Sequence, residues 1–356
     1  MSTNQHILTT LEASLSSNKA RLKVLAGIIL GIIKSRDVNL NTLASYQTSH
    51  AKHSSQHKKL YRFFLQWFIP WGDLIAFTLS RIPKPKEGYI LSMDRTNWKF
   101  GTMHVNILTV GVVVGKAAIP LVWSTLPQTT KRGNSNANQR IELMSKLLKH
   151  LPVEDIHFLA MDREFHGKKW LKWLNNQDLT WVLRIKKSTL VSGTSASNLG
   201  VSRAKDSSQR EEIWGLSLYF GCKSLLKGRD SHLYVVSNKF TPREALKAYQ
   251  KRWAIEVLFG HLKKKGFNLE NTHLCQADKM DRLIAVLALA FLFTVGWGLI
   301  VKEKNTLDAT EKRKSIFRLA LDLMRSMLEN PIYYKELMMI FQQWLAHEIK
   351  PSIFVL

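Results

Sequence analysis

Two apolar runs of this 356-residue chain, far apart in the sequence, each end in an aspartate. Residues 89–94 read Tyr-Ile-Leu-Ser-Met-Asp, and residues 156–162 read Ile-His-Phe-Leu-Ala-Met-Asp. Short apolar runs of this length predict buried β-strands. Ligands of open α/β sheets bind outside the carboxyl ends of the strands. The sequence therefore predicts that Asp94 and Asp162 stand at strand ends, where a binding site forms.

The segments around these two runs predict a definite order of elements. Apolar alternation, polar loops and helix-start signals separate the strands from the helices. The predicted elements are strands at 89–94, 103–114 and 117–123, a helix at 136–148, a strand at 156–162, a helix around 170–174 and a strand at 181–185. The first three strands form an antiparallel meander. This order, followed by a helix that carries an acid, is that of an RNase H-like fold, so we expect an α/β protein.

The acid-bearing helix is predicted between positions 249 and 263, where there is no proline and apolar residues recur at helical intervals. At about 100° per residue, one acid, two cations and one phenol share an arc of about 60°. The four residues are Tyr249, Arg252, Glu256 and Lys263. A solvated helix face has the same mixture of side chains. The function of this face therefore depends on whether Glu256 has carboxylate partners.

Asp94 and Asp162 are the partners that Glu256 needs for metal binding. Mg²⁺ prefers oxygen ligands in near-octahedral geometry. Two such ions about 3.5–4 Å apart activate an attacking oxygen and stabilise the leaving oxygen of a phosphoryl transfer. We therefore predict that Asp94, Asp162 and Glu256 are catalytic and bind two Mg²⁺ ions, for which Mn²⁺ can substitute.

The charge of the chain indicates its partner. There are 52 Lys and Arg residues against 27 Asp and Glu residues, a formal net charge of +25. An excess of this size indicates an acidic polymer or an anionic surface as partner. The interleaved aromatic residues suit base stacking and so favour a nucleic acid. We predict double-stranded DNA, with its phosphate held by Tyr249, Arg252 and Lys263. Further candidate DNA contacts are Arg95, Arg163, Lys131, Arg132 and Trp214.

Breaks in composition divide the chain into five predicted regions. Residues 83–88, Pro-Lys-Pro-Lys-Glu-Gly, are a turn-forming cluster that marks the first boundary. The regions are 1–85, helical, basic and DNA-binding; 86–187, the first part of the catalytic core; 188–240, a β-rich insertion; 241–302, the second part of the core with the Glu256 helix; and 303–356, C-terminal helices suited to dimerisation. Two interpretations of the first region stay open, a helix-turn-helix-like DNA reader and a plain helical bundle.

One stretch, from Leu283 to Val301, contains no charged residue and is long enough to span a bilayer. A buried core helix has the same composition, and basic residues lie on both sides of the stretch, so we expect no membrane contact. The two cysteines, Cys222 and Cys275, lack metal-ligand spacing and indicate a reducing compartment. The N-terminus shows no signal segment. We expect the protein to be cytoplasmic.

Several motifs at fixed spacing carry a family resemblance. The chain has Tyr-x2-Arg-x3-Glu-x6-Lys at positions 249, 252, 256 and 263, Asp-Arg-Glu-Phe at 162–165 and Asp-Arg at 94–95. It resembles, over about residues 85–300, the DDE transposases of bacterial insertion sequences, specifically insertion sequence family four. Four residues at fixed spacing, together with two strand-end aspartates in the right order, are far more specific than a lone acidic triple.

The resemblance implies cut-and-paste transposition by a bacterial enzyme that is nucleoid-associated when bound to DNA. Such an enzyme binds the terminal inverted repeats of its element, cleaves the ends and joins the freed 3′ ends to target DNA. A homodimer across paired ends, in a synaptic complex, is implied as well. The resemblance further implies a DNA hairpin intermediate with a flipped base held by aromatic residues. Which aromatic residue of this chain would hold that base is left open.

Three alternatives remain at this point. A catalytically silent, transposase-derived DNA-binding protein would keep the DNA contact, although both aspartates and all four signature residues are intact. An RNase H-like nuclease, such as a resolvase, would cleave DNA without strand transfer. A membrane protein built on the uncharged stretch is the third. Strand joining separates a transposase from the nuclease, and membrane extraction tests the last alternative.

Overall fold

The computed structural model describes residues 3–47, 51–101, 103–127, 134–199, 209–225, 231–303 and 314–345. The chain forms two compact units. Unit 1 comprises Met1–Pro83, Trp98–Val105 and Leu258–Leu356, and unit 2 comprises Lys84–Asn97 and Asn106–Val257. The five regions expected from the sequence stay predictions.

Unit 2 is built on one eight-stranded sheet with the order β3-β2-β1-β4-β5-β10-β9-β8. The strands are β1 (Tyr89–Phe100), β2 (Met103–Val114), β3 (Ala117–Thr125), β4 (Ile156–Met161), β5 (Trp181–Arg184), β8 (Glu211–Ile213), β9 (Leu216–Ser224) and β10 (His232–Ser237). A separate two-stranded sheet consists of β6 (Leu190–Val191) and β7 (Thr194–Ser195). The expected meander of three strands is present, since β2 pairs antiparallel with β3 and lies beside β1.

The sheet is mixed, with its parallel strands in the middle. β4 pairs in parallel with both β1 and β5. Strands that are buried on both faces read as continuous apolar runs, which is the pattern of β4. The strands expected within the β-rich insertion extend this same sheet, because β10 pairs antiparallel with β5 and β9 with β10. Val235 and Val236 of β10 are fully buried, so the pairing continues the core.

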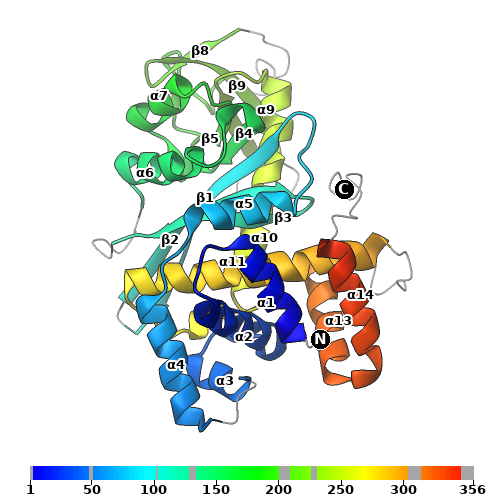
Figure 1. Cartoon of the computed structure of the whole chain (residues 1–356). Helices are drawn as coiled ribbons and strands as arrows, with labels where there is room; N and C mark the ends of the chain where they lie inside the picture. The colour runs from blue at the N-terminus through cyan, green and yellow to red at the C-terminus, as the bar shows by residue number, and fades with distance from the viewer. Residues whose placement is uncertain are drawn as a thin grey trace. The chain divides into compact units, whose positions relative to one another are not determined.

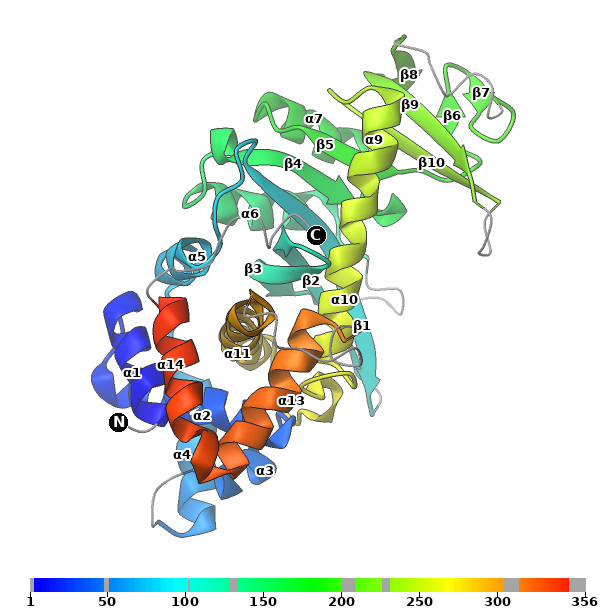
Figure 2. The ribbon, with the colours of Figure 1, turned by 90° about the vertical axis from the view of Figure 1, so that its right-hand side faces the viewer.

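Three of the described helices lie against this sheet. α6 (Ala137–Leu148) and α7 (Lys168–Asn176) lie on one face, and α9 (Pro242–Tyr249) crosses the other (Figure 1 and Figure 2). The small side chains of Ala245 and Ala248 let α9 approach the strands closely, against Phe158 and Val182. Tyr249, at the end of α9, belongs to the same packed cluster. The packing therefore fixes where the helical stretch with the third acid leaves the sheet.

The predicted end of the first strand is wrong. β1 continues past Asp94 to Phe100. Beyond Asp94 the side chains of Thr96 and Trp98 are buried, while those of Asn97 and Lys99 are exposed. This alternation has the period of a strand with one buried face, so a polar stretch that resembled a loop in the sequence extends the sheet.

The predicted helix from Tyr249 to Lys263 is also not one uniform α-helix. α9 ends at Tyr249, a 3₁₀ turn η3 follows (Gln250–Arg252), and α10 (Trp253–Leu262) completes the path. The three 3₁₀ residues change the rotation per residue locally. Lys263 lies just beyond the last residue of α10, and its backbone N–H still donates to Phe259 O at 3.1 Å. The common face expected for the four signature residues stays a prediction.

Unit 1 is helical and centred on α11 (Ala277–Glu303), which packs against α2, α4, α13 and α14. The surrounding helices are α1 (Thr3–Ser14), α2 (Lys19–Ser35), α3 (Leu40–Ser45), α4 (His53–Gln66), α5 (Trp71–Ser80), α13 (Ile316–Glu329) and α14 (Tyr334–Leu345). α11 is the one described helix that is long and apolar enough to cross a membrane, and its most apolar part is entirely buried in the structure. The DNA-binding role of residues 1–85 stays a prediction.

Candidate active site

The parallel pairing of β1 and β4 aligns Asp94 with Asp162. Met93 and Met161 are paired residues of the two strands, and each aspartate is the next residue of its chain segment. Parallel strands present equivalent positions at the same level of the sheet. Asp94 is 15% exposed and Asp162 is 27% exposed at the side chain. Both carboxylates therefore lie at the same level of the sheet and are partly buried. Asp94 lies within β1, and Asp162 directly follows β4.

The guanidinium of Arg252 joins Asp94 to the third acid. Its Nη1 donates to Asp94 Oδ2 at 3.1 Å, and its Nη2 donates to Glu256 Oε1. The pair Arg252–Glu256 has the i, i+4 spacing of facing residues on a helix. Arg252 is only 8% exposed at the side chain, whereas Glu256 is 36% exposed. A buried cation thus links a strand residue to a helix residue of unit 2.

Tyr249 links the same guanidinium to the second aspartate. Its hydroxyl donates to Asp162 Oδ1 at 3.0 Å and accepts from Arg252 Nε at 2.9 Å. The phenol ring packs among the sheet side chains beneath α9. The structure therefore brings together all three predicted acids through one Arg–Tyr pair, and each bond of this network lies within unit 2.

Burial is the largest influence on the pKa of Asp94 in this network. Burial raises the pKa of Asp94 to about 7, although Arg252 and the backbone N–H of Arg95 act in the opposite direction. The neighbouring charges of Asp162 and Glu164 raise it as well. A carboxylate with such a raised pKa, in contact with a charged partner, is typical of functional sites.

Arg252 and Tyr249, the two members of the network that are not acids, respond to the same burial. Burial alone would lower the pKa of Arg252, but Tyr249 and Glu256 together with the two aspartates raise it above its usual value. Burial also raises the pKa of Tyr249, so its phenol stays a neutral donor. Arg252 is therefore a permanent cation among three acids.

Two arginines hold the loop that follows Asp162. Arg95 donates to both carboxylate oxygens of Glu164, at 3.3 and 3.2 Å. Arg140, which is 5% exposed, donates to the backbone carbonyls of Glu164 and His166, each at 3.0 Å. Burial lowers the pKa of Arg140 to about 10, and Glu164 opposes this shift. Arg95, a candidate DNA contact, thus has its guanidinium on protein acceptors.

The remaining predicted DNA contacts are found in different settings. Arg163 is exposed, and Trp214 is half-buried with its ring stacked 6.0 Å from that of His166. Lys263 lies in unit 1, where its Nζ pairs with Glu270 at 3.2 Å and lies over the ring of Trp98. Lys131 and Arg132 fall outside the described residues.

Arg184, Glu164 and Arg140 are residues of this site that the sequence did not single out. Arg184 Nη1 lies 3.9 Å from Asp162 Oδ1. Its position at the end of β5, the parallel neighbour of β4, is the signal that could have identified it. Glu164 and Arg140 meet only through tertiary structure, and neither has a spacing that reveals the contact.

Acids from a strand, from a loop after a strand and from a helix are therefore connected through one guanidinium and one phenol. Residues 78–293, more than half of the chain, match the family described as the transposase DDE domain. The chain belongs to this DDE transposase family. The expected resemblance to DDE transposases is confirmed, and all three acids of the transposase lie inside the matched span. The family implies a DNA-binding enzyme that cleaves nucleic acid. No curated protein matches the sequence.

DDE transposases generally use divalent metal ions, which carboxylate oxygens of the protein bind. Among the described residues, no three His, Cys, Asp or Glu side chains are grouped closely enough to hold an ion as they stand. Asp94 and Glu256 instead bind Arg252, and Asp162 reaches it through Tyr249. Hard carboxylate oxygens that converge on one buried positive charge are suited to a divalent cation. The types of donor fit a divalent cation, whereas Arg252 holds two of the three acids in this structure.

Proposed function

We propose that this protein is a cut-and-paste transposase of the insertion sequence family four type. It binds the terminal inverted repeats of its element, cleaves them by metal-dependent hydrolysis and joins the 3′ ends to target DNA. The observation that carries the proposal is the network in which Arg252 and Tyr249 connect Asp94, Asp162 and Glu256. The spacing of Tyr249, Arg252 and Glu256, with Lys263 following, supports the assignment to this group.

In this proposal Asp94, Asp162 and Glu256 hold two Mg²⁺ ions, with Mn²⁺ as a substitute. When bound, such ions supply an activated oxygen nucleophile and stabilise the leaving oxygen of an in-line displacement. The three acids bring the negative charge that the ions require. Their convergence on one guanidinium supports this, because the charge of Arg252 compensates the acids when the ions are absent.

Arg252 then acts as the residue that exchanges partners. Its two terminal nitrogens donate to Asp94 and Glu256. Once these two carboxylates bind metal ions, they no longer accept hydrogen bonds from Arg252. A guanidinium released in this way matches the geometry of a phosphate, which it binds through two parallel hydrogen bonds. Tyr249 and Lys263 are proposed as further contacts of the terminal phosphate. The exchange would couple metal binding to the binding of DNA.

The wider arrangement of the reaction is also proposed. Two copies of the chain act on paired element ends in a synaptic complex, and the helices of residues 303–356 contribute to dimerisation. The basic helices of residues 1–85 contact the inverted repeats, and the enzyme works in the bacterial cytoplasm at the nucleoid. The net charge of +25 supports a polyanionic partner.

Strand joining is the experiment that tests this function. DNA from the borders of the coding region, carrying the inverted repeats, is incubated with the protein, a supercoiled target plasmid and Mg²⁺. We expect element ends covalently joined to the target. Cleaved ends without joined products would indicate a nuclease instead, and DNA that is bound but never cut would indicate the catalytically silent alternative.

A further inference from the structure

The outer side of α9 carries a row of exposed cations that the network of acids does not use. Arg243, Lys247 and Lys251 recur every fourth residue from α9 into the turn η3, so they lie along one side of the helical path. All three are exposed, whereas Ala245 and Ala248 between them are buried against the sheet. Since α9 lies on one face of the sheet, the row points away from the strands (Figure 2).

A fourth cation on this side comes from the sheet itself. Lys223 of β9 is exposed and pairs directly with Leu233 of β10, which packs in the same cluster as Ala245. Directly paired residues of antiparallel strands point to the same face, so Lys223 lies on the face that α9 covers. Gly221, two residues earlier on that face, is so close to α9 that an added Cβ would be 2.8 Å from Pro242 O. We call Lys223, Arg243, Lys247 and Lys251 the basic ridge.

The positive charge of the basic ridge is not compensated within the part of the chain that the structure describes. Lys239 and Arg252, which flank the helical row in the sequence, both form ion pairs. No ion pair between described residues involves a member of the ridge. Glu244 is the one acid of α9, and its Oε2 accepts from the backbone N–H and the hydroxyl of Thr241 at 2.9 and 2.7 Å. The ridge therefore attracts an anionic partner.

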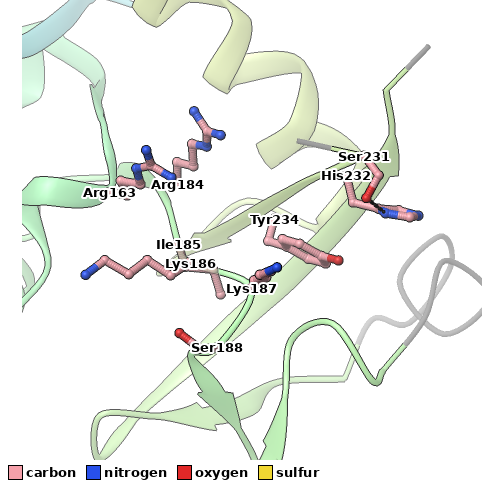
Figure 3. Close-up of a pocket in the computed structure, with 9 residues that line it drawn as sticks. All are labelled: Arg163, Arg184, Ile185, Lys186, Lys187, Ser188, Ser231, His232 and Tyr234. Carbon is pink, nitrogen blue, oxygen red and sulfur yellow. Dashed lines mark hydrogen bonds between the residues drawn. The ribbon is translucent and has the colours of Figure 1, made fainter. Parts of the chain in front are cut away.

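The basic ridge is a projecting surface and not a pocket. A cationic hollow of about 310 Å³ in unit 2 is lined by other residues, among them Arg163, Arg184, Lys186 and Lys187 (Figure 3). Small ligands are held in concave sites where polar groups surround them, and a row of exposed side chains does not provide such a site. The ridge suits a large polyanion that approaches the surface from outside.

The length of the ridge fits duplex DNA. Arg243 and Lys251 are eight positions apart, which is about 12 Å along a helix axis. The major groove of B-DNA is about 12 Å wide, so the two ends of the row can contact phosphates on both of its sides. Contacts of Lys and Arg with phosphates position a duplex but carry no sequence information. The ridge is therefore suited to duplex DNA of any sequence.

We propose that the basic ridge binds duplex DNA without regard to its sequence, and that this duplex is the target DNA. Naming the target rests on the proposed function, while the binding of duplex DNA does not. In that function the element ends are recognised by their repeats, whereas phosphate contacts alone suffice for a target of varied sequence. The row ends at Lys251, next to Arg252 in the chain, so a duplex that lies along it extends toward the acids.

Fluorescence anisotropy of the full chain with a labelled duplex tests the ridge without any chemistry. The duplex has about 20 base pairs, two helical turns, of a sequence unrelated to the element, and it is titrated in EDTA. Lys247→Gln combined with Lys251→Gln should weaken binding about tenfold. The slope of log K against log salt should become smaller by about 1.8, because two phosphate contacts are lost. Lys223→Gln with Arg243→Gln, which removes the other two cations, should have the same effect.

Lys116→Gln with Lys149→Gln is the matched control for the loss of two charges. Lys116 is exposed between β2 and β3, on the other side of the sheet order from β9, and Lys149 is exposed at the end of α6, on the face opposite α9. The control should change the affinity by about twofold at most. Equal losses in the control and the ridge variants would overturn the proposal, because binding would then depend on net charge alone. Unchanged binding in the ridge variants would overturn it as well.

Strand joining identifies the duplex that the ridge holds. With element ends and a supercoiled target, the ratio of joined to cleaved ends should fall about fivefold or more in Lys247→Gln combined with Lys251→Gln. An equal decrease in cleavage and joining would overturn the assignment to target DNA, since the ridge would then hold the element ends. Failure of the unsubstituted protein to join any ends would remove the proposed function, and weaker duplex binding by the ridge variants would still support the ridge as a DNA-binding surface.

Discussion

The hydroxyl of Tyr249 donates to Asp162 Oδ1 across 3.0 Å, although 87 positions separate the two residues in the chain. The same hydroxyl accepts from Arg252 Nε. One phenol therefore connects the aspartate after β4 to the guanidinium that binds the other two acids. The three carboxylates therefore interact through the same two side chains, and a substitution of any one residue in this network affects the remaining residues.

Tyr249→Phe removes only the bridging hydroxyl. The ring still fills its place under α9, so the loss is confined to two hydrogen bonds that involve charged groups. We expect a free energy of unfolding lower by about 1.5–3 kcal/mol, measured by urea denaturation without metal. Tyr219→Phe is the control, because the Tyr219 ring packs 4.7 Å from the guanidinium carbon of Arg210, outside the acidic network. An equal effect of the two substitutions would contradict the bridging role.

Arg252→Gln leaves Asp94 and Glu256 without their buried cation. Removing one partner of a buried ion pair costs about 3–5 kcal/mol, so the metal-free variant should have a lower Tm. Mg²⁺ or Mn²⁺ should raise the Tm of the variant by more than it raises that of the unsubstituted protein, because the ion no longer competes with a guanidinium. Differential scanning fluorimetry over a metal titration measures both effects.

Arg282→Gln is the matched control for Arg252→Gln. Arg282 makes an i, i+4 ion pair with Asp278 and donates to the backbone carbonyl of Trp67. Its loss should lower the Tm without enlarging the response to metal. A metal response in Arg252→Gln no larger than that of the control would mean that Arg252 and the ion do not share the same acids.

The raised pKa of Asp94 predicts how stability depends on pH. With a pKa of about 7 in the folded protein and about 3.9 when unfolded, the folded state holds the proton more tightly. Stability therefore falls as pH rises from about 4 to about 7 and is unaffected by this group above that range. The total loss in the free energy of unfolding over this pH range is at most about 4 kcal/mol.

Asp94→Asn isolates this contribution, since asparagine represents the neutral form at every pH. The Tm difference between Asp94→Asn and the unsubstituted metal-free protein should grow from pH 4 to pH 7 in favour of the variant. Thermal unfolding in EDTA at several pH values measures it. A difference that grows in favour of the unsubstituted protein would show that the ion pair with Arg252 outweighs burial.

Arg140→Met tests the support beneath the Asp162 loop. The substitution keeps much of the apolar stem but leaves the carbonyls of Glu164 and His166 without their donor. Unsatisfied buried acceptors cost about 1–3 kcal/mol each, so we expect a loss of about 3 kcal/mol or more in urea denaturation. Lys149→Met, at the exposed end of α6, should change stability by less than about 0.5 kcal/mol. Similar losses in both variants would contradict the role of Arg140.

The sequence was informative where a pattern maps directly onto local structure. The apolar runs before Asp94 and Asp162 predicted two buried strands, and their parallel register aligns the acids. The i, i+4 relation of Arg252 and Glu256 follows from helical spacing alone. Alternation along a strand directs Arg95 away from Asp94, and the guanidinium of Arg95 lies on Glu164.

Long-range contacts were beyond the sequence. β1 extends past Asp94 because its polar residues there pair with a neighbouring strand. The alternation of buried and exposed residues in this short polar stretch is too weak a signal to predict that pairing. The 3₁₀ turn Gln250–Arg252 interrupts the predicted helix without any signal in the apolar spacing. The bridge from Tyr249 to Asp162 requires α9 to cross the sheet at one angle, and only tertiary packing sets that angle.

Cleavage of labelled element-end DNA by Asp162→Asn tests the central claim most directly. Asparagine keeps the size of the side chain and its ability to accept from Tyr249 but removes the charge that a metal ligand needs. In Mg²⁺, we predict that the variant binds the DNA within about twofold of the unsubstituted protein and produces no cleaved strand. Cleavage by Asp162→Asn at a rate close to that of the unsubstituted protein would contradict the account, because the acid that completes the network would then have no part in the chemistry.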